Sequence, residues 1–133
     1  PNNPASVRGI GVRLADQYAL IPSEIAAIES ARLGYNAAIA AVADTYSTRL
    51  AFADVNAAFG TLLNNKVAIT NNITMTPNIN PPTGIYSEDG IHPNSRGYAF
   101  IANIFIDAIN EQFSASVPKA NPGSYRATGL PLP

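Results

Sequence analysis

The stretch Leu50-Ala51-Phe52-Ala53-Asp54-Val55 decides which fold the sequence predicts. It is short and almost continuously apolar, with one aspartate near its end. A run of this kind is typical of a strand that is buried on both faces, as in a parallel sheet covered by helices. We therefore expect a buried parallel strand at residues 50–55.

Helical patterns lie on both sides of this run. A helix is predicted from Ser23, whose hydroxyl can cap the first backbone N–H groups, to about residues 44–47. A short helix is expected at 56–63 and a longer one at 95–113, with Asn94 or Ser95 as its N-cap. The apolar positions at helical spacing in the two long helices are Ile25, Ile28, Tyr35, Ile39 and Val42, and Ile101, Ile104, Phe105, Ala108 and Ile109. The order helix, strand, helix, loop, helix predicts an α/β domain.

The remaining segments are expected to be irregular. Residues 1–22 are interpreted as a loop-rich leading segment, and 66–82 as a long surface loop with at most a short strand. The Pro-rich tail at 118–133 is interpreted as irregular. Together, residues 1–133 are interpreted as the C-terminal portion of a single domain. The start Pro1-Asn2-Asn3-Pro4 is read as sequence from the middle of a protein.

Composition excludes several classes of function. Hydrophobic residues make up 47% and charged residues 13% of the 133 residues, so the chain is apolar enough to fold around one core. The formal net charge of −1 comes without a basic stripe, so no nucleic-acid partner is expected. No apolar run approaches the roughly 18 residues that a membrane span needs. Cysteine is absent, which excludes thiolate catalysis but leaves an extracytoplasmic location open, since many exported bacterial proteins also lack cysteine.

The segment with the clearest chemistry is Gly84-Ile85-Tyr86-Ser87-Glu88-Asp89-Gly90-Ile91-His92-Pro93-Asn94. It contains the single histidine of the chain, three residues after an aspartate and next to a predicted helix start. Pro93 keeps His92 out of helical geometry, and Gly90 permits a tight turn. Asp89 can then accept a hydrogen bond from Nδ1–H of His92 and leave Nε2 free to act as a base. A single histidine supplies too few ligands for a zinc site, so neither metal nor cofactor is expected.

Asp89-Gly90-Ile91-His92-Pro93, followed by Asn94-Ser95-Arg96-Gly97-Tyr98 and an apolar helix, resembles the last conserved block of the SGNH (GDSL-type) serine hydrolases. With the helix from Ser23 and the run at 50–55, the resemblance covers roughly residues 20 to 117. It implies a three-layer αβα fold with a flavodoxin-like parallel sheet. It also implies hydrolysis of carboxylic or acetyl esters through an acyl-serine, with His92 as general base and Asp89 as the acid that orients it.

The other blocks of that family are missing. The sequence contains no Gly-Asp-Ser and no Gly-x-Asn-Asp, so the resemblance implies that the nucleophilic serine and the oxyanion donors lie upstream of Pro1. The expected partners are therefore a small-molecule, lipid or carbohydrate ester and the N-terminal half of the same protein as a second chain. Without that half, the chain is expected to self-associate and to be inactive.

Several residues have alternative interpretations. Ile85 and Tyr86 could form the wall of a substrate pocket or could only pack the loop. Asp54 could mark the ligand-binding edge of a parallel sheet or could cap the next helix. Glu88 could compete with Asp89 for the imidazole. For the chain as a whole, the alternative function is a non-catalytic α/β binding or structural module.

Overall fold

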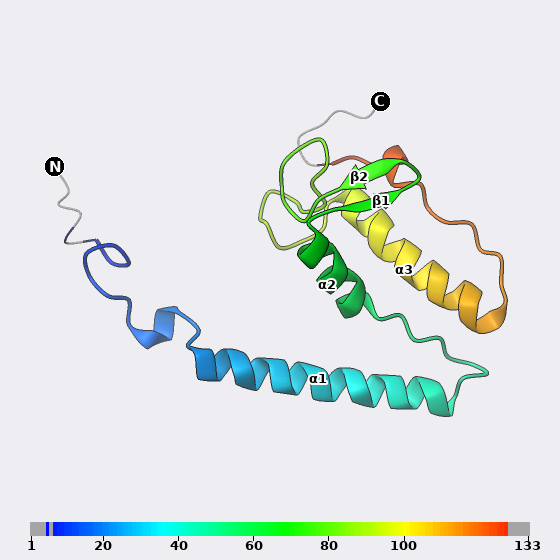
Figure 1. Ribbon diagram of the computed structural model, residues 1–133, viewed down its shortest axis with the longest axis horizontal. Coiled ribbons are helices and arrows are strands. Elements are labelled where there is room, and N and C mark those ends of the chain that lie inside the picture. The colour runs from blue at the N-terminus through cyan, green and yellow to red at the C-terminus, as the bar shows by residue number, and fades with distance from the viewer. Residues whose placement is uncertain (1–4, 6, 128–133) are drawn as a thin grey trace. The chain divides into compact units, whose positions relative to one another are not determined.

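The computed structural model describes residues 5 and 7–127 (Figure 1), and these residues fall into two compact units that divide between Val42 and Ala43. The first unit contains the short 3₁₀ helix η2 (Asp16–Tyr18) and most of helix α1 (Pro22–Thr45). The α1 helix begins within one residue of the predicted start. Its capping contact comes from Glu24, whose carboxylate accepts a hydrogen bond from the Ile21 N–H at 3.0 Å. A carboxylate in the first turn also suits the positive end of the helix dipole.

The second unit contains helix α2 (Val55–Asn65), strands β1 (Ala68–Thr70) and β2 (Ile73–Met75), helix α3 (Ser95–Phe113) and the 3₁₀ helix η3 (Pro122–Ser124). Strands β1 and β2 pair antiparallel, with Ala68 opposite Met75 and Thr70 opposite Ile73. Asn71 and Asn72 join them with φ angles of 51° and 62°. Two left-handed residues are the conformation of a tight two-residue hairpin, which asparagine tolerates well. A hairpin therefore stands in the region predicted to be a long loop.

The predicted fold class is wrong. In the part of the chain that the structure describes, the only sheet is this two-stranded antiparallel hairpin, and no three-layer αβα arrangement with a parallel sheet is present. The expected strand at 50–55 is also absent. Residues 50–54 have no regular secondary structure, and Val55 is already the first residue of α2.

Asp54 explains why a helix begins at the end of this run. Its carboxylate accepts a hydrogen bond from the Ala57 N–H at 2.8 Å and caps α2, so the helix-cap interpretation of Asp54 is confirmed. A buried strand needs neighbouring strands to satisfy its backbone N–H and C=O groups. A helix satisfies those groups locally, and here the cap and the alanines that follow it favour the helix.

The core of the second unit is small. Leu62 from α2, Met75 from β2 and Ile85 are each at most 2% exposed and pack together. The partly buried residues around them are Phe59, Ala68, Ile73, Tyr86 and Phe100. Phe59 meets Phe100 edge to face, with ring centroids 5.6 Å apart, which joins α2 to α3. The core thus lies directly beneath the segment that precedes Asp89.

Helix α3 has the predicted bounds, and Asn94 is its N-cap as expected. Its buried side, however, contains Gly97, Ala99 and Asn103, whereas Phe105 and Ile109 of the expected buried face are exposed. Asn103 exchanges two hydrogen bonds with the backbone of Ala120 and so holds the returning tail against the helix. Apart from η3, the described part of the tail is irregular as predicted, and residues 128–133 lie outside the described residues. None of the described helices combines the length and hydropathy that crossing a bilayer requires.

Candidate active site

Residues 87–92 form a closed loop in front of α3. The Ser87 N–H donates to the carbonyl of His92 at 2.8 Å, and the Gly90 N–H donates to the carbonyl of Ser87 at 3.0 Å. Gly90 has a φ angle of 71°, in the left-handed region that glycine adopts without steric cost. The loop therefore returns on itself within six residues and brings Asp89 back towards His92.

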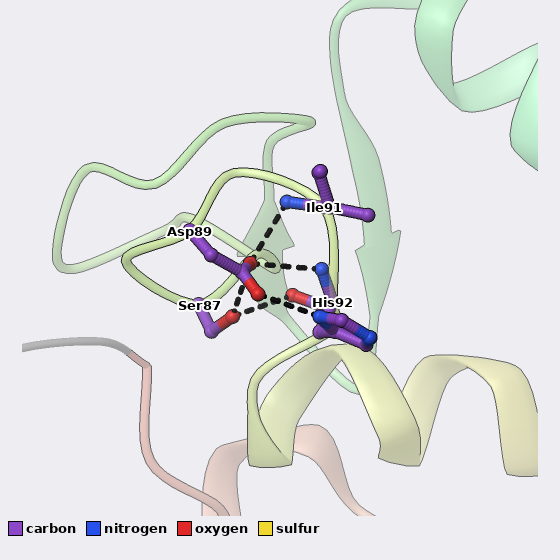
Figure 2. Close-up of polar contacts among 4 residues, drawn as sticks. All are labelled: Ser87, Asp89, Ile91 and His92. Carbon is purple, nitrogen blue, oxygen red and sulfur yellow. Dashed lines mark hydrogen bonds and ion pairs between the residues drawn. The ribbon is translucent and has the colours of Figure 1, made fainter.

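The carboxylate of Asp89 lies at the centre of this loop (Figure 2). Its Oδ1 accepts hydrogen bonds from Ser87 Oγ at 2.7 Å and from the backbone N–H groups of Ile91 and His92 at 2.9 Å each. Its Oδ2 accepts a hydrogen bond from Nδ1 of His92 at 2.6 Å. The hydrogen bond to His92, followed by those from Ile91, Ser87 and the His92 backbone, holds the pKa of Asp89 well below its usual range. Asp89 is therefore ionised at neutral pH.

His92 is held at one nitrogen and free at the other. Because Nδ1 donates to Asp89, the neutral imidazole carries its lone pair on Nε2. The side chain is 71% exposed, and within the described residues no hydrogen bond reaches Nε2. The hydrogen bond expected between Asp89 and Nδ1 is thus present, and Glu88 is not the partner of the imidazole. This arrangement can accept a proton at Nε2 and stabilise the resulting imidazolium.

Asn94 fixes the loop to the start of α3. Its Nδ2 donates to the carbonyls of Gly84 at 2.8 Å and Tyr86 at 3.1 Å, and its Oδ1 accepts from the Gly97 N–H at 3.0 Å. Gly97 has to be glycine, because a Cβ there would lie 2.2 Å from the carbonyl oxygen of Ile85. The start of the helix and the segment before Asp89 are therefore in backbone contact.

Arg96 holds the same region from a second side. Its guanidinium donates to three carbonyls, those of Pro82, Pro122 and Tyr125. These contacts join the segment before the loop to the tail after α3. The guanidinium of Arg96 thus bonds to backbone carbonyls on both sides of α3 in the sequence, and its role here is structural.

The two candidate substrate-contact residues have different surroundings. Ile85 is fully buried and belongs to the core with Leu62 and Met75. Tyr86 is partly buried and packs against Phe59, with ring centroids 6.5 Å apart. Both side chains pack the loop, and a contact of either one with a substrate stays a prediction.

No protein-family model, no curated protein and no solved structure matches this chain.

Sequence reasoning missed the role of two polar residues around the pair. Ser87 binds the carboxylate of Asp89, and the only signal for it was a hydroxyl two residues before the aspartate. Arg96 binds carbonyls up to 29 residues away along the chain, and nothing local in the sequence marks those contacts.

Within the described residues, no group of three or more His, Cys, Asp or Glu side chains gathers as a metal site would require. A shallow hollow of about 300 Å³ lies between Phe52 and the end of α3, lined also by Ala108, Glu111 and Gln112. It begins roughly 20 Å along the helix from Ser95, given a rise of about 1.5 Å per residue, and includes no residue of the site.

Proposed function

We propose that this chain is the acid–base portion of a serine esterase of the SGNH type. The observation that carries the proposal is the 2.6 Å hydrogen bond between Oδ2 of Asp89 and Nδ1 of His92, with Nε2 exposed. An imidazole oriented by a carboxylate at one nitrogen and open at the other is the arrangement that a serine nucleophile needs beside it. The proposal rests on this loop and on the Asp-Gly-Ile-His-Pro motif.

The proposed nucleophile lies outside residues 1–133. Among the described residues, Ser87 is the serine bonded to the pair, but its Oγ lies within hydrogen-bonding distance of Asp89 Oδ1 and the His92 carbonyl oxygen, on the Nδ1 side of the ring. A nucleophile has to approach Nε2 instead, because that nitrogen takes the proton. The resemblance assigns the serine and the oxyanion donors to a segment upstream, present either in the same polypeptide or as a second chain.

In the proposed reaction, the serine Oγ bonds to the carbonyl carbon of a carboxylic or acetyl ester while its proton passes to Nε2 of His92. The imidazolium then gives that proton to the departing alkoxide, so an alcohol leaves and an acyl-serine remains. Water attacks the acyl-serine with His92 again as base, which releases the acid and restores the serine. Asp89 stays ionised throughout and stabilises the imidazolium.

The test uses the full natural polypeptide that contains these residues. It should hydrolyse p-nitrophenyl acetate, and a serine-directed fluorophosphonate should abolish the activity by modifying a serine outside residues 1–133. Peptide mass spectrometry locates the label. The 133-residue chain alone should turn over the ester no faster than free imidazole.

Two results would contradict the proposal. Modification of Ser87 or another serine within residues 1–133 would mean that the nucleophile is misassigned. A full polypeptide that neither hydrolyses esters nor reacts with the fluorophosphonate would favour a non-catalytic binding or structural module.

A further inference from the structure

Ser87 holds the same carboxylate that orients His92. Its Oγ lies 2.7 Å from Oδ1 of Asp89 and 2.9 Å from the carbonyl oxygen of His92. A hydroxyl has one proton to donate, so these two acceptors compete for it. The shorter contact leads to the ionised oxygen, and hydrogen bonds to a charged acceptor are the stronger ones. The proton of Ser87 therefore belongs mainly to the bond with Asp89.

The consequence of that bond is a fixed orientation of the carboxylate. Oδ1 receives three donors, from Ser87 Oγ and from the N–H groups of Ile91 and His92, whereas Oδ2 receives the imidazole (Figure 2). The two backbone donors approach from the returning part of the loop, and Ser87 approaches from the other end of the loop. Without the hydroxyl, Oδ1 would be held from one end only, and the carboxylate of a half-exposed residue could rotate towards water.

We propose that Ser87 is a positioning residue that fixes the tautomer of His92 by holding the carboxylate of Asp89. With Oδ1 anchored, Oδ2 stays in line with Nδ1 and keeps the proton on that nitrogen. Nε2 then stays unprotonated in the neutral ring. The significance of this tautomer for ester hydrolysis rests on the proposed function, but the tautomer itself is a property of the loop and is measurable without any activity.

The decisive experiment is ¹⁵N NMR of the imidazole in the full 133-residue chain at about pH 9, where imidazoles are neutral. His92 is the only histidine, so its ring signals need no assignment. In the unmodified chain, Nδ1 should be the protonated nitrogen. Ser87→Ala should shift a measurable part of the population to the Nε2–H tautomer, whereas Ser87→Thr, which keeps a hydroxyl, should restore the original distribution. If Ser87→Ala does not fold, Ser87→Cys provides the same comparison, because a thiol is a weak donor.

Two control variants separate the possible failures. Asp89→Asn should lose the Nδ1–H preference altogether, and Ser95→Ala, at an exposed position on the adjacent helix, should leave it unchanged. If Asp89→Asn shifts the tautomer but neither Ser87→Ala nor Ser87→Cys does, the role of Ser87 is refuted while the pair stands. If Asp89→Asn also has no effect, both the role of Ser87 and the proposed function fail.

In the active polypeptide, Ser87→Ala should lower kcat by about three- to ten-fold, the effect of one lost hydrogen bond, with KM unchanged.

Discussion

The proposed chemistry of this chain depends on a carboxylate and an imidazole three residues apart. Asp89 accepts four hydrogen bonds, all of them from residues between Ser87 and His92. Such a carboxylate is stabilised in its charged form. At the scale of single residues, the pair leaves Nε2 of His92 as the nitrogen that can accept a proton.

Replacing His92, the proposed base, should lower kcat/KM far more than replacing Asp89, the residue that orients it. In the full natural polypeptide, His92→Ala should lower kcat/KM on the order of 10⁴-fold or more, because the serine loses its proton acceptor. Asp89→Asn should cost less, since an imidazole in the wrong orientation still accepts a proton part of the time. The rate of p-nitrophenyl acetate hydrolysis measures both. Glu88→Gln is the matched control, because Glu88 is exposed and does not bond to the ring. If Asp89→Asn left the rate unchanged and Glu88→Gln lowered it strongly, the orienting acid would be Glu88 and not Asp89.

The low pKa of Asp89 predicts an acid-sensitive contribution to stability. Folding lowers the pKa of this carboxyl below its unfolded value of about 3.9, so its contribution is present above about pH 4 and is lost as the pH falls further. Urea unfolding of the chain and of Asp89→Asn should therefore differ more at about pH 6 than at about pH 3. Added salt should reduce the difference, because the pair is exposed to solvent. A difference independent of pH would mean that the carboxylate is not stabilised by the fold.

At the scale of elements, the site exists because a loop and a helix end share backbone contacts. Asn94 caps α3 and at the same time binds two carbonyls of the segment before Asp89. It is only 9% exposed, so these carbonyls have little access to water as an alternative partner. One side chain thus connects helix formation to the placement of His92.

Asn94→Ala should therefore destabilise the fold more than an ordinary cap replacement. A lost N-cap costs about 1 kcal/mol, and leaving buried carbonyls unsatisfied adds about 1–3 kcal/mol. The free energy of unfolding from urea titration measures the loss. Ser95→Ala, one residue further on and exposed, should change it by less than about 0.5 kcal/mol. Equal effects of the two substitutions would show that the carbonyl contacts of Asn94 contribute nothing.

At the scale of the whole molecule, little apolar surface is buried for so apolar a sequence. The buried apolar residues of the described part are Ala43, Leu62, Met75, Ile85, Ala99 and Ala127, and half of these are alanines. By contrast, α3 alone exposes Tyr98, Phe105, Ile109 and Phe113, which follow one another at intervals of seven, four and four residues along the helix. A contiguous apolar stripe on a helix is a surface that associates when no partner covers it.

The isolated chain should consequently self-associate. Light scattering after size exclusion should give a mass above the 14.0 kDa of one chain, and the dye ANS should fluoresce in its presence. Phe105→Glu should lower the average mass, because it puts a charge in the middle of the α3 stripe. A monodisperse monomer that does not bind ANS would argue against a missing partner.

The features that the sequence determined correctly are local. The pairing of Asp89 with His92 spans three residues, and the Asn94 cap of α3 depends on contacts within one turn. Contacts of this range depend on spacing and backbone preferences that the sequence carries directly, such as Gly90 in the turn and Pro93 after His92. The helix bounds of α3 follow for the same reason.

The features that only the tertiary structure decided involve partners far away along the chain. The run at 50–55 could have been a strand, but a strand requires neighbouring strands to satisfy its backbone, and none of the described residues pairs with it in a sheet. The sequence left open whether Ile85 packs the loop, and only the folded chain shows it packed against Leu62 and Met75 in the core. Which of two locally acceptable states a segment adopts is set by the burial and hydrogen bonding that distant residues supply, and that information is not contained in the segment itself.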